Sequence, residues 1–402
     1  MKNLGVIFGG VTCEHDVSIV SGLQLIENVN KDKYNIVPIY IHSDGTWYTG
    51  DKLLDANIYK NFEMHKGEVK EAIIPPNKKG LVVSEKGLFA KEKVIDLDVV
   101  IPSMHGMNGE DGTLQGLLEL ADIPYSSSGV LGSSIGMDKI LMKKVFESFD
   151  LPVLPYTFFI REEWEKDREK VLLQVENALS YPMFVKPSNL GSSIGISKAT
   201  DRESLVHAIE VAVSYDSRIV VEKGVENLKE INCSALGYQD DVETSCCEEP
   251  ISWKEFLTFE DKYLRNAKGG AKSAPAKIAN MPVKGSKQGS MANMDRRIPA
   301  QIPDEQTNLI KEYTIKAFKA LNSKGVVRID YIIDNDTNQV YINEINTIPG
   351  SFAFYLWKHD GLEYPELIDR LVNIAEKSYE DKHKNNYTFS SNIIGNITKV
   401  EK

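Results

Sequence analysis

The chain has 402 residues, 42% hydrophobic and 26% charged, and this length exceeds what one hydrophobic core supports, so about two to three domains are expected. Its net charge of −11 argues against bulk binding of nucleic acid. No run approaches the roughly 18 apolar residues of a membrane span, and the first residues lack a signal-peptide pattern, so a cytoplasmic protein without a membrane partner is expected.

The first third of the chain alternates strand and helix patterns. Apolar runs predict strands at Leu4–Phe8, Tyr34–Ile41 and Val99–Pro102, and a helix from about Val17 to Val29. The poorly patterned residues 50–95 are expected to form a peripheral hairpin region. Such alternation predicts a parallel sheet with helices on its faces, in which ligands gather at the carboxyl ends of the strands.

Two polar clusters follow strand ends in this part of the chain. One contains Glu14 and the other contains His105, and both are therefore expected to face a ligand site. For His105 the alternative is a structural histidine whose hydrogen bonds are satisfied within the fold.

The middle of the chain carries a candidate phosphate site. A helix is predicted from about Ser133 to Phe149, and residues 151–155 form a proline-containing linker into a new unit. Beyond this linker, Lys186 ends a short strand and precedes the Gly/Ser-rich segment 187–195. Backbone N–H groups, hydroxyls and an ammonium group suit phosphate oxygens, whereas a mobile surface turn is the alternative.

A strand that ends in exposed backbone and acidic groups follows. The apolar run Arg218–Glu222 ends in Glu-Lys-Gly-Val, and Glu230 comes eight residues after Glu222. Such a strand end can contact the edge of an adenine ring and the hydroxyls of a ribose, so it is a candidate site for a nucleoside beside the phosphate-binding segment.

The strongest pattern lies at residues 326–345, where two β-rich runs flank a polar turn and predict a hairpin. Side chains two apart share one face of a strand, so Arg328 and Asp330 point the same way. Glu344 and Asn346 share a face of the second strand in the same manner. These oxygen ligands suit Mg²⁺ together with substrate phosphates, and the arginine would neutralise charge on a transferred group. A hairpin with one solvated polar face is the alternative.

A basic segment interrupts an otherwise acidic chain. Residues 261–300 contain nine lysines or arginines and two aspartates. We expect this segment to be a lid that becomes ordered when nucleotide binds. A solvated insertion is the alternative. A nucleic-acid patch is the least favoured interpretation, because no aromatic residue follows Tyr263 within the segment.

Eight motifs occur in order along the chain: EHDVS at 14–18, HGMNGEDG at 105–112, MDK at 137–139, VKPSNLGSSIG at 185–195, EKG at 222–224, DKY at 261–263, RID at 328–330 and NEINTIPG at 343–350. Together they resemble the D-alanine–D-alanine ligase family of the ATP-grasp superfamily, over most of the chain from about Leu4 to Leu371. The loop at 265–297 and the stretches after Gly350 and Ser378 depart from that resemblance.

The resemblance implies an α/β fold with α+β subdomains, in which a Rossmann-like parallel-sheet domain precedes a two-lobed ATP-grasp fold. The expected boundaries are 1–124 for the N-terminal substrate domain, 125–221 for the central subdomain and 222–378 for the C-terminal subdomain. A basic lid loop at 261–300 and a polar tail at 379–402 complete the chain, and the resemblance suggests a homodimer.

The resemblance also implies a reaction. ATP phosphorylates the carboxylate of a first D-alanine, and the amine of a second D-alanine displaces the phosphate. The implied nucleotide contacts are Lys139, Lys186, Ser193, Glu222, Gly224, Val225, Glu230 and Lys262. The implied ligands of two Mg²⁺ ions, for which Mn²⁺ can substitute, are Asp330, Glu344 and Asn346.

The same resemblance assigns the substrate-binding groups. Glu14 would hold the ammonium group of the first D-alanine beside His105, and Ser192 and Tyr263 would close the site with Glu14. The oxyanion hole would consist of Arg328 and the Gly350 N–H, with donors each contributing about 3–4 kcal/mol in comparable acyl chemistry.

The acceptor end departs from the family pattern. Typical members carry a serine that helps to hold the acceptor carboxylate, whereas this chain has Tyr355 at the ungapped position. The expected acceptor contacts are therefore Ser351, Tyr355 and Leu356. Because Lys262 and Tyr263 resemble the amino-acid-accepting branch, D-alanine is expected first and D-serine second, in preference to D-lactate. Local repacking with unchanged substrate choice is the alternative to an altered acceptor.

The function that follows is ATP-dependent ligation of two D-alanines for peptidoglycan precursor synthesis. A ligase that forms D-alanyl-D-serine or another D-alanyl-D-amino acid is the first alternative. The other is an inactive nucleotide-binding regulatory protein on the same fold, and the intact charged set around Arg328 argues against it.

Overall fold

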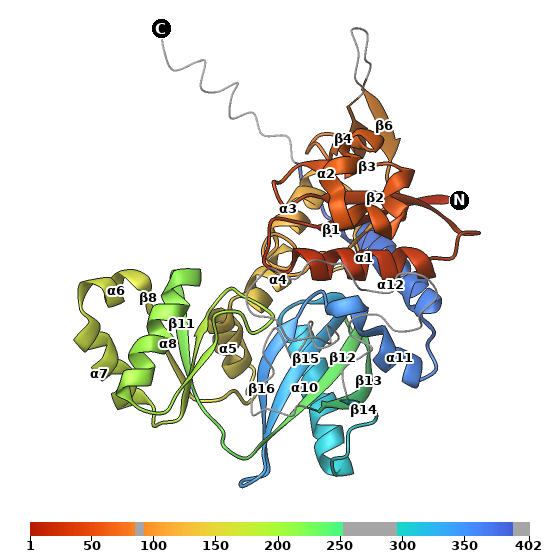
Figure 1. Cartoon of the computed structure of the whole chain (residues 1–402). Coiled ribbons are helices and arrows are strands. Elements are labelled where there is room, and N and C mark those ends of the chain that lie inside the picture. The colour runs from red at the N-terminus through yellow and green to blue at the C-terminus, as the bar shows by residue number, and fades with distance from the viewer. Residues whose placement is uncertain (85–91, 252–295, 389–402) are drawn as a thin grey trace, which may run out of the picture.

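The computed structural model describes residues 1–84, 92–251 and 296–388. Within these ranges the strands form sheets of seven, four and five strands. Figure 1 shows an N-terminal lobe, in red to orange, above a central lobe in yellow to green and a C-terminal lobe in green to blue. Lys262, Tyr263 and most of the predicted lid lie outside the described residues, as does the predicted tail from residue 389.

The N-terminal sheet has the strand order β6-β5-β4-β3-β2-β1-β7. Strand β1 pairs in parallel with β2 and β7, and the pairs from β2 to β6 are antiparallel. The predicted strands at 34–41 and 99–102 are confirmed. The bounds are β1 Lys2–Gly9, β2 Tyr34–Ile41, β3 Trp47–Thr49, β4 Lys70–Ile73, β5 Gly80–Val83, β6 Lys93–Asp96 and β7 Val99–Pro102.

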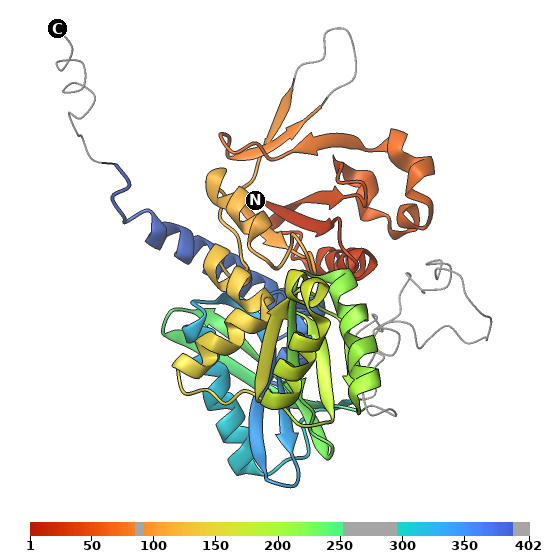
Figure 2. The same cartoon turned by 90° about the vertical axis from the view of Figure 1, so that its left-hand side faces the viewer.

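Alternating side chains place this sheet between two hydrophobic layers. On β1, Val6 and Phe8 face a core that includes residues of α1 and α12, whereas Ile7 faces a second core that includes Leu114 and Leu118 of α3. The bounds of these helices are α1 His15–Asn28, α3 Thr113–Leu120 and α12 Tyr364–Lys382. Figure 2 shows α12 running beneath the N-terminal sheet, so the end of the chain completes the first lobe.

The region predicted as a peripheral hairpin contains short turns before its strands. Strands β4, β5 and β6 extend the sheet as an antiparallel edge. The turns between β3 and β4 are η1 Asp51–Leu54, η2 Ala56–Asn61, α2 Phe62–His65 and η3 Lys66–Glu68.

The helix predicted across Ser133–Phe149 is wrong as a single element. The structure has α4 Val130–Met137 and α5 Lys139–Ser148, separated at Asp138. The Asp138 carboxylate accepts the N–H groups of Ile140 and Leu141 at 3.0 and 2.9 Å and so begins a new helix. This break orients Lys139 at the start of α5.

The central lobe is a four-stranded antiparallel sheet in the order β10-β9-β11-β8. Its helices pack on one face, with Trp164, Val175 and Ile209 among the buried contacts. The opposite face carries Lys186 of β9. The bounds are β8 Tyr156–Ile160, α6 Arg161–Lys166, α7 Arg168–Ala178, β9 Met183–Pro187, β10 Ser197–Ala199, α8 Arg202–Tyr215 and β11 Arg218–Lys223.

The C-terminal lobe is a five-stranded antiparallel sheet in the order β14-β13-β12-β15-β16. Helices α5 and α10 cover one face through a core that contains Phe146, Phe318 and Ile329. The predicted hairpin is confirmed as β15 and β16. The bounds are β12 Leu228–Tyr238, β13 Asp241–Pro250, β14 Arg296–Arg297, α10 Asp304–Ala320, β15 Lys324–Asp334, β16 Gln339–Asn346, η5 Gly350–Ala353 and α11 Phe354–His359.

Helix α12 continues past the point where the polar tail was expected to begin. The Tyr379 hydroxyl donates to Asp122 at 2.8 Å, and Lys382 pairs with Glu119. The chain from residue 379 to Lys382 is therefore helical and contacts the N-terminal lobe. No helix within the described ranges is long and apolar enough to cross a membrane.

Candidate active site

A pocket opens where the three lobes meet. Its lining combines residues from the start of α1, the segment after β9 and the β15–β16 hairpin. Twelve of the predicted site residues line it, namely Glu14, His105, Lys186, Ser192, Ser193, Glu230, Arg328, Asp330, Glu344, Asn346, Gly350 and Tyr355. The pocket is also lined by residues that were not predicted from the sequence, among them Glu110, Asn232, Glu248, Arg296 and Asn343.

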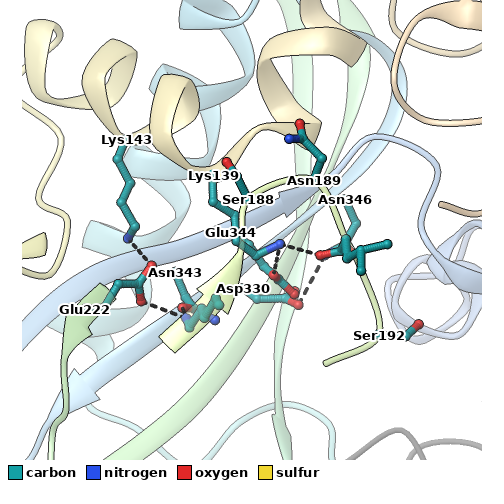
Figure 3. Close-up of polar contacts among 12 residues, drawn as sticks. Lys139, Lys143, Ser188, Asn189, Ser192, Glu222, Asp330, Asn343, Glu344 and Asn346 are labelled. Carbon is teal, nitrogen blue, oxygen red and sulfur yellow. Dashed lines mark hydrogen bonds and ion pairs between the residues drawn. The ribbon is translucent and has the colours of Figure 1, made fainter. Parts of the chain in front are cut away.

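The hairpin brings the predicted metal ligands together. Asp330 of β15 lies opposite Glu344 of β16, and Arg328 lies opposite Asn346. The Asn346 amide donates to Asp330 at 3.2 Å, and Figure 3 shows these oxygens gathered on one side of the hairpin. Two carboxylates and an amide oxygen at this spacing are the donor set that Mg²⁺ takes when phosphates complete its shell.

Arg328 is held by the same aspartate. Its Nε and Nη2 donate to the two Asp330 carboxylate oxygens at 2.7 and 2.8 Å. Burial opposes the positive charge, but the adjacent carboxylate raises the pKa of Arg328. The guanidinium is therefore a fixed cation that faces the pocket beside Gly350.

A bulge in β16 adds a polar group to this face. Asp330 pairs with Glu344 and the next residue, Tyr331, pairs with Ile342, so Asn343 has no residue opposite. Both Asn343 and Glu344 consequently line the pocket, although neighbouring residues in a regular strand point to opposite faces. The Asn343 side-chain oxygen accepts from Lys186 at 3.1 Å.

Three residues form an ion cluster below this face. Glu222 accepts from Lys186 at 2.7 Å and pairs with Lys143 at 3.1 Å. Burial alone would raise the pKa of Glu222, but the two ammonium groups lower it to about 2, and burial lowers the pKa of Lys143. Lys143 was not predicted, although it stands one helical turn after Lys139 in α5, and Figure 3 shows both side chains pointing towards the sheets.

The Gly/Ser-rich segment closes on the N-terminal lobe. The Ser192 hydroxyl donates to the Glu14 carboxylate, and both Ser192 and Ser193 have positive φ, 51° and 59°. Lys139 binds this segment from α5, since its Nζ donates to the Leu190 carbonyl at 2.7 Å. Lys139 also lies 3.5 Å from Glu344 and so links the segment to the hairpin.

The His105 ring is fully used in hydrogen bonds within the fold. Its Nδ1 donates to the Ile348 carbonyl at 2.9 Å, so the neutral ring accepts the Ser21 hydroxyl at Nε2, at 2.7 Å. Burial lowers the pKa of His105 to about 4. This is the arrangement that a structural role requires, and it positions the turn before Gly350.

Glu110 supports the same turn from the other side. Its carboxylate accepts the N–H of Gly106 at 2.8 Å and that of Ile348 at 2.9 Å. Removal of this group from water, with Glu14 nearby, raises the pKa of Glu110 to about 8. Glu110 lies in the motif HGMNGEDG at 105–112, but it was not among the predicted site residues.

The expected acceptor contacts separate in space. Tyr355 lines the pocket and donates its hydroxyl to Glu248 at 2.7 Å. Ser351 is buried and donates to Gln24 at 2.5 Å, and Leu356 is fully buried in a small apolar cluster; neither is among the pocket-lining residues.

The expected adenine contacts also lie apart from the lined pocket. The carboxylate of Glu222 is taken up by the two lysines, and the Gly224 N–H donates to the Pro182 carbonyl at 2.8 Å. Neither Gly224 nor Val225 lines the pocket, whereas Glu230 of β12 does. The contacts of these residues with a nucleotide remain predictions.

The fold and pocket define a class of protein, and solved structures identify it. A D-alanine–D-alanine ligase of Coxiella burnetii superposes with a TM-score of 0.75 at 25% identity and covers 95% of this chain and 96% of its own. The VanG D-Ala:D-Ser ligase of Enterococcus faecalis gives a TM-score of 0.75 at 29% identity over 93% and 99% of the two chains. The architecture is thus that of the ATP-grasp ligases.

Sequence comparison identifies the family within this class. The family model described as D-ala D-ala ligase N-terminus matches residues 3–128, and the one described as D-ala D-ala ligase C-terminus matches residues 145–288 and 284–373. The D-alanine–D-alanine ligase of Bacillus cytotoxicus is 39% identical over 96% of this chain and 98% of its own length. That of Acetivibrio thermocellus is 38% identical over 95% and 98%. The chain belongs to the D-alanine–D-alanine ligase family.

Proposed function

We propose that this chain uses ATP to join two D-alanine molecules into D-alanyl-D-alanine for peptidoglycan precursor synthesis. The observation that carries this proposal is the meeting of three lobes at one pocket. Glu14 comes from the first lobe, Ser192 from the second, and Arg328 with Asp330 from the third. Family membership over nearly the full length supports the same conclusion.

The first step activates the donor carboxylate. In this proposal the Glu14 carboxylate holds the ammonium group of the first D-alanine, and the carboxylate of that D-alanine faces the hairpin. One carboxylate oxygen then attacks the terminal phosphorus of ATP, and ADP leaves. Lys139 and Lys186 neutralise phosphate charge, and closure of the Ser192 segment excludes water from the acyl phosphate.

The second step forms the peptide bond. The unprotonated amine of the acceptor attacks the activated carbonyl carbon, and the carbonyl oxygen gains negative charge. Arg328 and the Gly350 N–H are the donors for this oxygen, and loss of one such donor costs about 3–4 kcal/mol in comparable acyl transfer. The nitrogen gives up one proton, collapse of the tetrahedral species releases hydrogen phosphate, and no covalent enzyme intermediate is required.

The oxygens of Asp330, Glu344 and Asn346 fit Mg²⁺ because they lie on facing residues of two adjacent strands. Magnesium bound there would neutralise charge on the phosphate oxygens of ATP. Lys139 lies beside Glu344 and Arg328 is paired with Asp330, so these carboxylates also have cationic side chains of the protein as partners.

A D-alanyl-D-serine ligase is the second candidate. It is favoured by Tyr355, whose side chain lines the pocket where family members typically carry a serine. The Enterococcus faecalis relative with this printed specificity is 29% identical. An amino acid acceptor in preference to D-lactate is common to both candidates. We infer a cytoplasmic location and a homodimer on the same family grounds.

The deciding experiment is phosphate release from ATP and Mg²⁺ with and without D-alanine. A ligase releases phosphate only when D-alanine is present, in proportion to the dipeptide formed. A nucleotide-binding regulator that has lost ligation would bind ATP but show no D-alanine-dependent release.

A further inference from the structure

One set of charged pocket residues has no part in the chemistry described above. Glu248 of β13 and Arg296 of β14 form an ion pair at 3.1 Å, with side chains that are 3% and 11% exposed. Both line the pocket together with Arg328, Gly350 and Tyr355. A buried ion pair contributes little net stability because the desolvation of both charges offsets their attraction. Its position in the pocket therefore calls for another role.

The pair is held in a defined orientation. The Glu248 carboxylate also accepts from the Tyr355 hydroxyl at 2.7 Å and from the Asn232 amide at 2.9 Å. The Arg296 guanidinium carbon lies 4.0 Å from the centre of the Tyr355 ring, a stacked cation–π arrangement. Arg296 is thus fixed by a charge on one side and an aromatic ring on the other, and its planar fork matches a carboxylate.

The acceptor needs a cation at this end of the pocket. An amino acid that attacks with its amine still carries a negative carboxylate, and taking this charge out of water requires a paired donor. The groups expected for this task are engaged elsewhere. The single O–H of Tyr355 donates to Glu248, and the Ser351 hydroxyl donates to Gln24.

The other two cationic side chains of the pocket have roles in the proposed reaction. Lys186 donates to Glu222 and Asn343, on the side of the expected phosphates. Arg328 donates to both Asp330 carboxylate oxygens, and in the proposed reaction it stabilises the oxyanion of the tetrahedral species. Arg296 stands 4.0 Å from the centre of the Tyr355 ring, and Arg296, Arg328 and Tyr355 all line the pocket.

We propose that Arg296 binds the carboxylate of the acceptor amino acid, and that Glu248 and Tyr355 are positioning residues that hold its guanidinium. This assignment rests on the proposed ligase function and replaces the serine of typical family members, at the position of Tyr355 in α11, by an arginine of strand β14. It makes the acceptor carboxylate, rather than the acceptor side chain, the group that Arg296 recognises.

The test offers the enzyme two acceptors that differ only in this group. D-alanine and D-alaninamide, each supplied with ATP, Mg²⁺ and D-alanine as donor, compete as acceptors, and the two products are resolved by mass. Wild type is expected to prefer the carboxylate. In Arg296→Met the kcat/KM for D-alanine as acceptor should fall roughly 30-fold or more, a typical loss when one partner of a buried charge pair is removed. The rate with D-alaninamide should stay within about threefold.

Arg297→Met is the matched control. Arg297 follows directly in β14, is half exposed and pairs with Glu249 instead, and it does not line the pocket. It should leave both acceptor rates unchanged. Glu248→Gln keeps the side-chain shape while removing the charge that orients Arg296, so its acceptor KM should rise while its ATP affinity stays that of wild type.

The outcomes distinguish a wrong assignment of Arg296 from a wrong assignment of the ligase function. An active Arg296→Met variant that retains the wild-type preference for D-alanine over D-alaninamide overturns the assignment of Arg296 alone. Absence of any D-alanyl product from the wild type overturns the ligase function and the assignment with it. ATP binding measured by calorimetry on each variant shows that a loss of rate is not a loss of folding.

Discussion

The carboxylate of Glu110 accepts the main-chain N–H of Ile348 at 2.9 Å and so joins the N-terminal lobe to the turn that ends in Gly350. His105 holds the carbonyl of the same residue at 2.9 Å. The main-chain N–H and C=O of Ile348, in the third lobe, are therefore both hydrogen-bonded to side chains of the first lobe. The Gly350 N–H owes its position to side chains that lie about 240 residues earlier in the chain.

This relationship predicts a pH dependence of stability. The pKa of Glu110 is raised to about 8 in the folded protein, whereas an unfolded glutamate titrates near 4.5. Between these values the folded state holds a proton that the unfolded state has released, so stability falls as pH rises from about 4.5 to 8. Glu110→Gln removes this titration. Urea unfolding without nucleotide should show a flatter profile over this window, and an unchanged slope would contradict the assignment.

Loss of a predicted metal ligand should abolish activity with little loss of stability. Glu344 is partly exposed, and its partner Lys139 also donates to the Leu190 carbonyl, so the Lys139 ammonium keeps a hydrogen-bond acceptor in Glu344→Gln. Ligation should fall roughly 100-fold or more, because charge on the transferred phosphate loses its compensation. D-alanine-dependent phosphate release at saturating Mg²⁺ measures this. Near-normal turnover would remove Glu344 from the metal site.

Asp330 will behave differently. Its carboxylate is the bidentate partner of Arg328, so Asp330→Ala leaves a largely buried guanidinium without its main counter-charge. Removing one partner of a fully buried ion pair lowers the free energy of unfolding by about 3–5 kcal/mol. The loss is smaller here, because the Asp330 side chain is 15% exposed and solvent screens the remaining charge. Thermal unfolding should show a lower midpoint for Asp330→Ala than for Asp330→Asn. A midpoint for Asp330→Ala equal to that of the wild type would mean that the pair contributes nothing to stability.

The ion cluster around Glu222 predicts an order of stabilities. Glu222→Gln leaves two neighbouring ammonium groups in a buried site, whereas Lys143→Met leaves Glu222 paired with Lys186. Glu222→Gln should therefore cost about 3–5 kcal/mol and Lys143→Met clearly less. Urea unfolding of both variants measures the difference, and the reverse order would show that Lys186 alone does not compensate Glu222.

The contact between Ser192 and Glu14 predicts an effect on catalysis alone. Ser192→Ala removes the side-chain hydrogen bond that closes the central lobe on the donor site. The kcat/KM for D-alanine should fall about 10- to 100-fold, as expected when a reactant loses its fixed orientation. Because Ser192 is partly exposed, the unfolding midpoint should not change. A lower midpoint with normal kinetics would assign Ser192 a structural role instead.

The sequence predicted the parts of the site that follow from local periodicity. The two-residue repeat placed Arg328 beside Asp330, and the polar turn marked the hairpin. The bulge at Asn343 could not be predicted, because an extra residue in one strand leaves no mark in composition. The end of α4 at Asp138 was missed because the apolar pattern runs through it, although Asp before a helical run is an N-cap signal.

The acceptor end was predicted least well, since its residues come from distant strands. Glu248 and Arg296 are separated by 47 intervening residues and meet because β13 and β14 pair. No spacing rule connects such positions. Ser351 was expected at the pocket from its place after Gly350, but three consecutive residues with positive φ turn its side chain towards Gln24 of α1.

The most direct measurement offers D-alanine, D-serine and D-lactate in equal amounts with ATP and Mg²⁺ at neutral pH, and resolves the products by mass. We expect D-alanyl-D-alanine as the main product, D-alanyl-D-serine as the second, and phosphate released in an amount equal to that of the dipeptides formed. A reaction that yields no D-alanyl product would contradict the ligase function, and a dominant D-alanyl-D-lactate product would contradict the amino acid acceptor.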